Sequence, residues 1–309
     1  KVPGNESEKY SLDMRQLKNY CSSYLLEPSK GIPMVITQRM EGMNGKLRIN
    51  VSLTALEDVY FNFSEQLSTG FNHDDCQFYM PGFWYRRNLR SPKEAPSFHT
   101  SDSWLVREDR LSAPLTGIYS EKEKSFVTVS RIDNFANEVL STHREGEIIL
   151  SGKTSIGFTG FENQNGVATL SFGFPYREAP KSYIRKLTLA PAVEAFQSLR
   201  KGETMLLTWE ILENKADDYS DFIRNAWEYS YDTYAPVPVD TPYSIEDMKE
   251  VMSRFFVNSL VTGNSLTFNS GIHLRTAGVT VRQKLVLLAV YSLMHSMLGN
   301  IVGNVAEKI

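Results

Sequence analysis

The chain has 309 residues, of which 41% are hydrophobic and 22% are charged, a composition typical of a soluble globular protein that can hold two domains. The formal net charge is −3 and basic residues are interspersed with acidic ones, which argues against a DNA or RNA partner. Cys21 and Cys76 are too few for a disulfide scaffold or a four-thiolate metal site, but they leave a single bridge open.

The first predicted element is a short helix over residues 11–26, within an N-terminal lead of residues 1–30. Leu12, Leu17 and Tyr20 recur at helical intervals, and Glu27-Pro28 ends the pattern. The chain begins at Lys1 without a methionine, as a mature or trimmed protein would. We therefore expect that any export signal has been removed.

Residues 31–215 are predicted to form a β-domain, because short segments in this range alternate polar and apolar side chains. The predicted strands are Lys46–Ser52, Val59–Phe63, Ser125–Ile132, Gly146–Leu150, Thr154–Thr159, Val167–Phe174, Lys186–Leu189 and Met205–Leu212. Asn163–Gly166 predicts a hairpin turn, because Asn-Gly tolerates the positive φ angles of a tight connection. Short strands with few helices between them favour a mainly β fold, an antiparallel β-sandwich, over a parallel α/β sheet.

Aromatic and charged side chains are concentrated in residues 78–115, where Pro81-Gly82 and two further prolines predict a folded-back, loop-rich segment. Flat faces from Trp84, Tyr85 and Trp104, beside planar arginine donors, suit a sugar ring and its hydroxyl or carboxylate rim. The arginines and acids concerned are Arg86, Arg87, Arg90, Arg107, Arg110, Glu108 and Asp109. An alternative stays open: the tryptophans cap a core, and the arginines pair with Glu94, Asp102, Glu108 and Asp109 in a structural network.

Residues 216–262 are predicted to contain a linker helix and the first helix of an α-helical domain. Tyr219–Tyr234 carries Phe222, Ile223, Trp227 and Tyr231 at spacings of one helical face. After the proline-stiffened connector of residues 235–242, a second helix is predicted over residues 244–261. Ser244, three residues before Asp247, gives that helix an N-terminal capping pattern.

Residues 263–309 are an apolar tail in which Leu285–Val302 approaches the length and hydrophobicity of a membrane span. His295, Asn300 and nearby serines and glycines interrupt this stretch, so no membrane span is expected.

Familiar catalytic and cofactor motifs are absent or incomplete. Ser151–Thr154 (SGKT) resembles the end of a phosphate-binding loop, but the required first glycine is replaced by Glu147. His73–Cys76 (HDDC) has metal-binding residue types without a second ligand group at a recognisable spacing, and neither HExxH nor GxSxG occurs. We therefore predict no cofactor and no metal, and the catalytic residues are unknown.

Four segments resemble secreted Bacteroidetes proteins of the six-hairpin glycosidase type. They are GFWYRRN (Gly82–Asn88), WLVREDRLSAPL (Trp104–Leu115), FGFPYRE (Phe172–Glu178) and FIRNAWEYSYDTYAP (Phe222–Pro236). The resemblance covers about residues 30–260 and implies a supersandwich-like β-domain followed by an (α/α) toroid that carries the catalytic carboxylates. Almost the whole toroid is missing from this chain.

The resemblance implies a secreted, periplasmic or cell-surface protein of polysaccharide utilisation that is glycoside hydrolase-like and has an oligo- or polysaccharide partner. It gives a substrate-side role to Trp84, Arg86, Arg87, Trp104, Arg107, Glu108 and Asp109. The chain alone is not expected to be catalytic. The alternative is a non-catalytic carbohydrate-binding or surface structural protein. A toroid encoded downstream favours the first interpretation, and a natural stop after a folded C-terminus favours the second.

The tail after Thr276 also departs from the resemblance, which implies a toroid helix at this point. Ordinary codons for Lys284–Asn300, read from one base earlier, can spell a sequence with that helix's pattern. We therefore hypothesise that a frameshift produced residues 276–309, which would then form a poorly anchored apolar helix. The coding DNA tests this hypothesis.

Overall fold

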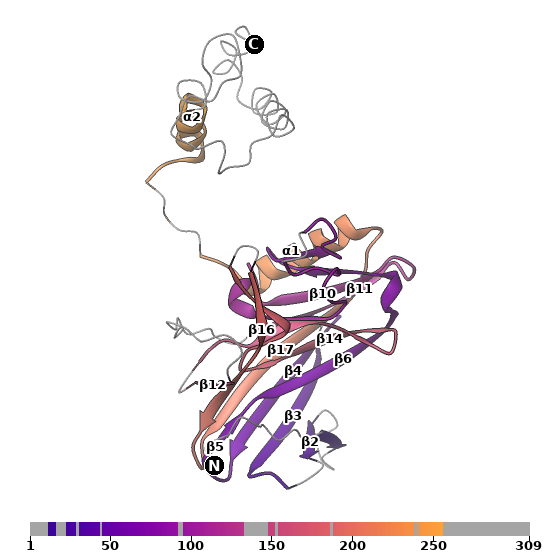
Figure 1. Cartoon of the computed structure of the whole chain (residues 1–309), viewed down its shortest axis with the longest axis vertical. Coiled ribbons are helices and arrows are strands. Elements are labelled where there is room, and N and C mark those ends of the chain that lie inside the picture. Colours follow the sequence, from indigo (N-terminus) through magenta and orange to yellow (C-terminus); the bar gives the residue numbers. More distant parts are fainter. Residues whose placement is uncertain are drawn as a thin grey trace. The chain divides into compact units, whose positions relative to one another are not determined.

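The computed structural model describes residues 12–16, 23–28, 31–43, 45–91, 95–132, 148–151, 154–185, 188–237, 240 and 242–255 (Figure 1). The chain divides into two units, Lys1–Pro236 and Val237–Ile309. In the first unit the described residues form two β-sheets and one α-helix, and in the second they form one α-helix.

The first sheet has nine strands, and every neighbouring pair is antiparallel. In spatial order they are β1 (Leu12–Gln16), β2 (Ser23–Pro28), β3 (Met34–Met43), β4 (Lys46–Ala55), β17 (Thr204–Lys215), β11 (Ser125–Arg131), β10 (Leu115–Ser120), β7 (Cys76–Met80) and β8 (Trp84–Arg86).

The second sheet has eight strands, of which only the pair β12 and β16 is parallel among the described residues. In spatial order they are β12 (Ile148–Ser151), β16 (Thr188–Leu199), β15 (Arg177–Arg185), β9 (Trp104–Arg107), β13 (Phe158–Gln164), β14 (Val167–Phe174) and β6 (Phe63–Asn72), with β5 (Val59–Phe61) also paired to β16. Two short 3₁₀ turns are η1 (His73–Asp75) and η2 (Glu108–Arg110). The predicted mainly β, antiparallel architecture is confirmed.

The main core lies between the two sheets, where alternate side chains of each strand meet. On β4, Ile49, Val51 and Leu53 are buried while their neighbours are more exposed. From the opposite sheet Phe172 packs on Trp209, with 5.3 Å between ring centroids. The apolar side chains whose alternation predicts a strand at Lys46–Ser52 therefore point into the core.

The hairpin predicted at Asn163–Gly166 is confirmed. Gln164 and Val167 are the last paired residues of β13 and β14, and the two residues between them have positive φ angles, 53° at Asn165 and 85° at Gly166. The Asn163 side chain accepts a hydrogen bond from the Gly166 amide at 2.8 Å, which closes the turn.

The helix predicted over residues 11–26 is wrong, because this part of the chain contains strands β1 and β2. The two strands pair with each other, and β2 pairs with β3 at the edge of the first sheet. The spacing of apolar residues in this N-terminal lead is compatible with the period of a helix and with that of a strand. The free backbone groups of β3 offer hydrogen bonds that an isolated short helix cannot match.

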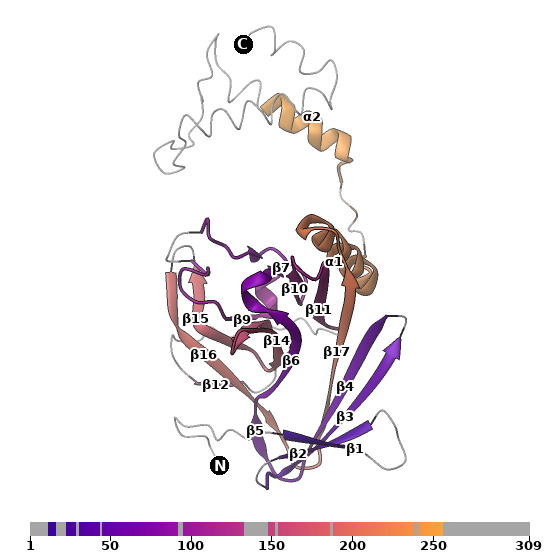
Figure 2. The same cartoon turned by 90° about the vertical axis from the view of Figure 1, so that its right-hand side faces the viewer.

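Helix α1 (Tyr219–Tyr234) lies along the outer face of the first sheet, beside β10 and β11 (Figures 1 and 2). The Asp218 side chain caps the start of α1 by accepting hydrogen bonds from the backbone amides of Ser220 and Asp221. Its buried stripe consists of Tyr219, Phe222, Ala226, Tyr229 and Ser230.

The predicted apolar face of this helix is therefore corrected. Phe222 is fully buried, but Trp227 and Tyr231 are 54% and 60% exposed. The buried stripe is rotated toward Ala226 and Tyr229, because the sheet accepts Phe222 at Gly117, where a Cβ atom would lie only 2.6 Å from the Phe222 ring. Since contacts divide the chain after Pro236, α1 belongs to the same unit as the sandwich.

In the second unit, α2 spans Ile245–Phe255. The predicted cap is present and reciprocal, since the Asp247 amide donates to the Ser244 hydroxyl and the Ser244 amide donates to the Asp247 carboxylate, both at 3.0 Å. The predicted continuation of this helix to residue 261, the apolar tail and the frameshift hypothesis lie outside the described residues. Among the residues that the structure does describe, no helix is both long and apolar enough to cross a bilayer.

Candidate functional site

The segment of residues 78–115 carries the chain from the first sheet to the second. It contains the end of β7, the short strands β8 and β9, and the turn η2, joined by irregular turns. The expected loop-rich segment is therefore present, with two short strands inside it.

The two tryptophans of this segment belong to the core. Trp84 and Trp104 are both 0% exposed, and their rings lie 5.8 Å apart. Their indole nitrogens donate to the backbone carbonyls of Arg86 at 2.9 Å and Ser101 at 3.0 Å. This corrects the expectation that they stack on a sugar, because neither indole has an exposed face. The alternative prediction, that the two tryptophans belong to a core, is the one that the structure supports.

Arg107 and Asp109 form a bidentate ion pair, with nitrogen–oxygen distances of 2.9 Å and 2.6 Å. Burial opposes the charge on Arg107, but the hydrogen bonds that Arg107 donates to Asp109 and the negative charges of Asp109 and Glu178 together outweigh burial and raise the pKa of Arg107. Arg107 is 6% exposed, and its guanidinium also lies 4.7 Å from the centre of the Tyr176 ring. The pair therefore anchors the end of β9 more than it faces solvent.

Glu108 accepts hydrogen bonds from Arg131 at 3.0 Å and from the Gly157 amide at 2.8 Å, and both side chains of the Glu108–Arg131 pair are almost completely buried. Arg110 pairs with the buried carboxylate of Glu178. The charged partners Arg131 and Glu178 come from β11 and β15, outside the segment, so the local pattern could not identify them.

Asp102, another predicted ion-pair partner in the segment, behaves differently from Glu108 and Asp109. The Asp102 carboxylate accepts from the Asn163 side chain at 2.7 Å. Glu94 lies outside the described residues. Arg87 donates to the backbone carbonyls of Asp74 and Cys76 and lies over the Phe98 ring at 5.2 Å, which ties it to the structure of the segment.

An exposed surface, which we call the loop face, consists of Tyr85, Arg86 and Trp227. Tyr85 is 47% exposed and its ring lies 5.6 Å from that of buried Tyr79. Trp227 on α1 is 54% exposed and is also a neighbour of Tyr79, because its side chain partly offsets the rise in the Tyr79 pKa that burial causes. The sequence pattern singles out Tyr85 but predicts that Trp227 lies on the apolar face of its helix, so this combination could not be predicted.

The backbone of the loop face is held in an uncommon conformation. Arg86 has a φ angle of 57°, which residues other than glycine rarely adopt. Its amide donates to the Tyr219 hydroxyl at 2.8 Å, and that hydroxyl donates to the Phe78 carbonyl at 2.8 Å. The Arg86 guanidinium lies 4.8 Å from the centre of the Tyr219 ring. Helix α1 therefore fixes both the backbone and the side chain of Arg86.

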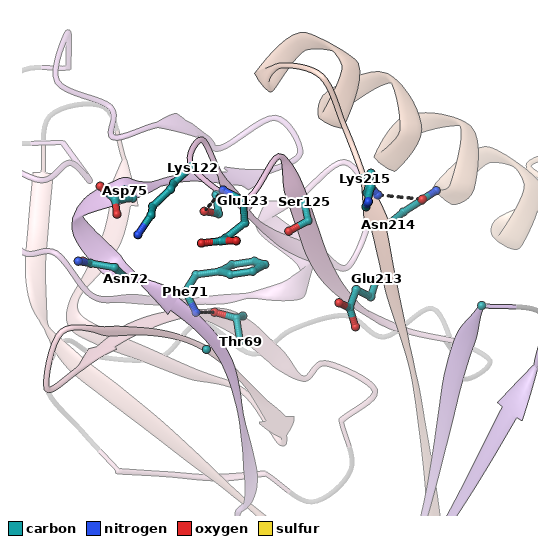
Figure 3. A pocket seen from close by; sticks show the side chains of 13 residues that line it. Thr69, Phe71, Asn72, Asp75, Lys122, Glu123, Ser125, Glu213, Asn214 and Lys215 are labelled. Atoms are coloured by element: carbon teal, nitrogen blue, oxygen red, sulfur yellow. Dashed lines mark hydrogen bonds between the residues drawn. The ribbon is translucent and has the colours of Figure 1, made fainter.

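A separate hollow, which we call the end groove, has a volume of about 870 Å³ (Figure 3). It lies between the β3–β4 turn, the end of β6, the β10–β11 turn and the end of β17. Its lining includes Phe71, Asp75, Lys122, Glu123, Glu213 and Lys215. None of these residues was selected from the sequence as a substrate-binding candidate, because four distant segments must come together to form the groove.

In the HDDC segment, the side chains of His73 and Cys76 both have partners within the protein. The His73 ring stacks near Phe98, with 5.7 Å between centroids, and its Nε2 lies 3.0 Å from the Asp102 carbonyl. Cys76 is a free, buried thiol that donates to the Asn72 carbonyl at 3.1 Å, while Cys21 lies outside the described residues. In the part of the chain that the structure describes, no group of three or more His, Cys, Asp or Glu side chains could hold a metal ion.

Comparison with protein-family profiles and with curated proteins finds no match. Among solved structures, a galactose mutarotase related enzyme from Lactobacillus acidophilus is similar at 13% identity and a TM-score of 0.36, over 67% of this chain and 72% of that chain. A putative aldose 1-epimerase from Escherichia coli K12 has 10% identity and a TM-score of 0.33, over 67% of this chain and 69% of that chain.

A GH36 α-galactosidase from Geobacillus stearothermophilus is similar at 12% identity and a TM-score of 0.35, over 68% of this chain. The match spans only 27% of that enzyme's length. At these TM-scores the likeness carries no inference about chemistry, which rests on the side chains described above. The resemblance to six-hairpin glycosidases stays a prediction.

Proposed function

We propose that this chain is the N-terminal β-sandwich portion of a secreted, carbohydrate-active, glycoside hydrolase-like protein, in which it contacts the glycan and does not cleave it. The proposal combines the sequence resemblance with one structural observation. The loop face presents two exposed aromatic side chains and an arginine from segments that are far apart in sequence.

Exposed aromatic rings beside a cationic fork suit a sugar, because the ring packs on the apolar face of a pyranose and the guanidinium donates to its oxygens. Tyr85 and Trp227 supply the rings, and Arg86 supplies the fork. This moves the expected stacking surface from Trp84 to its neighbour Tyr85, which points outward from the same short strand.

The loop face is also fixed before any ligand arrives. The Arg86 amide is bonded to Tyr219 on α1, and the Tyr85 amide donates to the Asn88 side chain at 3.0 Å. A surface that is already ordered loses little conformational entropy on binding. The positive φ angle at Arg86 is the kind of local strain that clusters at functional sites.

Replacement of the exposed aromatic residues tests the proposal. Tyr85→Ala and Trp227→Ala should each weaken binding to oligosaccharides that the parent chain retains on a glycan array by about 5- to 10-fold, since one stacked ring contributes on the order of 1 kcal/mol. Isothermal titration measures the affinity, and both variants should melt near the parent temperature because neither side chain is in the core.

Tyr60→Ala is the matched control. Tyr60 is 40% exposed on β5, which lies in the other sheet, so its loss should not change glycan affinity. The proposed contact surface would be rejected if Tyr85→Ala and Trp227→Ala bound every retained glycan as tightly as the parent.

A further inference from the structure

The end groove is shaped by a bulge in β6. Val167 of β14 pairs with Asn72 and Thr169 pairs with Ser68, so the three residues Thr69–Phe71 lie opposite the single residue Ala168. Gly70 has a φ angle of 74°, which allows the extra residues to loop outward. Bulges of this kind redirect side chains and are common beside binding sites.

Hydrogen bonds hold the bulge in one geometry. The Thr69 hydroxyl donates to the Ala168 carbonyl at 2.6 Å and accepts from the Phe71 amide at 3.2 Å. Phe71 is half-buried against the core, and its ring lies at the centre of the groove, below Glu123 (Figure 3). The bulge therefore presents part of an aromatic ring in the middle of a polar hollow.

Charged side chains of both signs surround this ring. Asp75, Lys122, Glu123, Glu213 and Lys215 line the groove, and within the described part of the chain none of these side chains has a salt bridge or a side-chain hydrogen bond. Lys122 and Glu123 extend from the β10–β11 turn, while Glu213 and Lys215 come from the end of β17 (Figure 3). Their hydrogen-bonding capacity is available to a ligand.

The mixture of signs selects the class of ligand. An anion would use the two lysines and be repelled by the three carboxylates, whereas a cation would face the converse problem. A hydroxyl group both donates and accepts, so a polyol can donate to the carboxylates and accept from the ammonium groups. A pyranose also has an apolar face that can pack on the exposed part of Phe71.

We infer that the end groove is a binding site for a neutral saccharide, distinct from the loop face. Phe71 contacts the sugar ring, Glu123 and Glu213 accept hydrogen bonds from its hydroxyls, and Lys122 donates to its oxygens. A volume of about 870 Å³ lies within the range of sites that hold small organic ligands. The site deepens the proposed function, on which its substrate class rests, by adding a second point of glycan contact.

The test uses the full chain on an array of neutral and acidic oligosaccharides, followed by titration with a retained neutral oligosaccharide. Phe71→Leu keeps an apolar side chain but removes the flat ring, and Glu123→Gln removes the acceptor charge. Each should lower the affinity at least about 5-fold. Glu121→Gln is the matched control, because Glu121 is an exposed acid in the same turn but does not line the groove.

The outcomes separate the two surfaces. If Tyr85→Ala weakens binding and the two groove variants do not, the groove inference fails and the loop face stands. If the groove variants weaken binding and Tyr85→Ala does not, the loop-face proposal fails and the groove inference stands. Retention of acidic oligosaccharides only, or of no saccharide at all, overturns the groove inference. Should Phe71→Leu lower the melting temperature, Glu123→Gln decides.

Discussion

Glu210 shows how one side chain joins the linker helix to the sandwich. On β17 it accepts from Arg48 at 3.0 Å, lies 3.2 Å from the Lys46 ammonium, and accepts from the Tyr229 hydroxyl of α1 at 3.0 Å. Burial favours the neutral acid, but these three partners outweigh burial and lower the pKa of Glu210 below its ordinary value of 4.5. The folded state therefore favours the carboxylate.

This pKa shift predicts a pH dependence of stability. Because the folded pKa is depressed, the stabilisation is complete above the unfolded value of 4.5 and is lost as pH falls through the folded pKa. Glu210→Gln should be less stable at pH 7 by roughly 2 kcal/mol, and its free energy of unfolding should fall less steeply than that of the parent below pH 4.5. Urea denaturation between pH 3 and pH 7, at steps of about one unit, measures both.

Glu213→Gln is the control for this measurement, since Glu213 lies on the same strand without an ion pair among the described residues. Equal slopes for the parent and Glu210→Gln below pH 4.5 would show that Glu210 does not carry the acid sensitivity.

Trp84 and Tyr85 show how the burial of a single side chain decides whether it can contact a ligand. They are adjacent on β8, yet Trp84 is 0% exposed and Tyr85 is 47% exposed. Successive side chains of a strand point to opposite faces, so one residue enters the core and the next enters solvent. Composition alone favours the larger tryptophan as a sugar platform, whereas burial favours the tyrosine.

At the scale of elements, the position of α1 depends on one glycine. Gly117 on β10 lies under Phe222, and a Cβ atom there would be 2.6 Å from Phe222 Cζ and 3.0 Å from Thr128 Cγ2. Phe222 packs among aromatic rings, at 5.0 Å from Phe126 and 5.8 Å from Tyr119, and it is 0% exposed. It has little room to move away from an added methyl group.

Gly117→Ala should therefore destabilise the protein by about 1–3 kcal/mol through overpacking, seen as a lower melting temperature. Adding Phe222→Leu to Gly117→Ala should recover part of this loss of stability, because the smaller side chain makes room for the added methyl group and the two positions are in contact. Gly42→Ala on β3 is the matched control, since a Cβ atom at Gly42 meets nothing within 4 Å. Gly117→Ala with the parent's melting temperature would refute this account of how α1 is seated.

At the scale of the whole molecule, the described sandwich uses its buried carboxylates for structure. Glu108, Glu178 and Glu210 are each paired with an arginine and almost completely buried. A general acid and base must instead reach the reacting oxygen and a water molecule. The predicted resemblance to six-hairpin glycosidases implies that those two groups lie in a helical domain.

We therefore expect the purified chain to release no product from aryl glycosides or from oligosaccharides that it binds. Colorimetric detection of the aryl leaving group and of reducing ends measures turnover, with an active glycoside hydrolase as the assay control. Robust hydrolysis that is abolished by replacing one carboxylate within residues 1–260 would contradict this expectation.

Much of the local structure follows from the sequence by itself. Alternation in Lys46–Ser52 predicts a strand, Asn-Gly predicts the β13–β14 hairpin, and Ser244 with Asp247 predicts the start of α2. These signals depend on neighbours within a few residues, whose dihedral preferences and hydrogen bonds act wherever the chain lies. The antiparallel sandwich follows because many such strands occur with few helices between them.

Only the tertiary structure decides which surfaces are covered and which side chains meet. The lead became two strands because β2 pairs with β3, and Trp84 became core because the second sheet covers its face. The Arg110–Glu178 pair joins residues 68 positions apart. The end groove likewise combines four distant segments, two turns and two strand ends, and none of them has a recognisable pattern alone. Burial and long-range pairing depend on how sheets pack, and a local sequence pattern contains no information about the surface that packs against it.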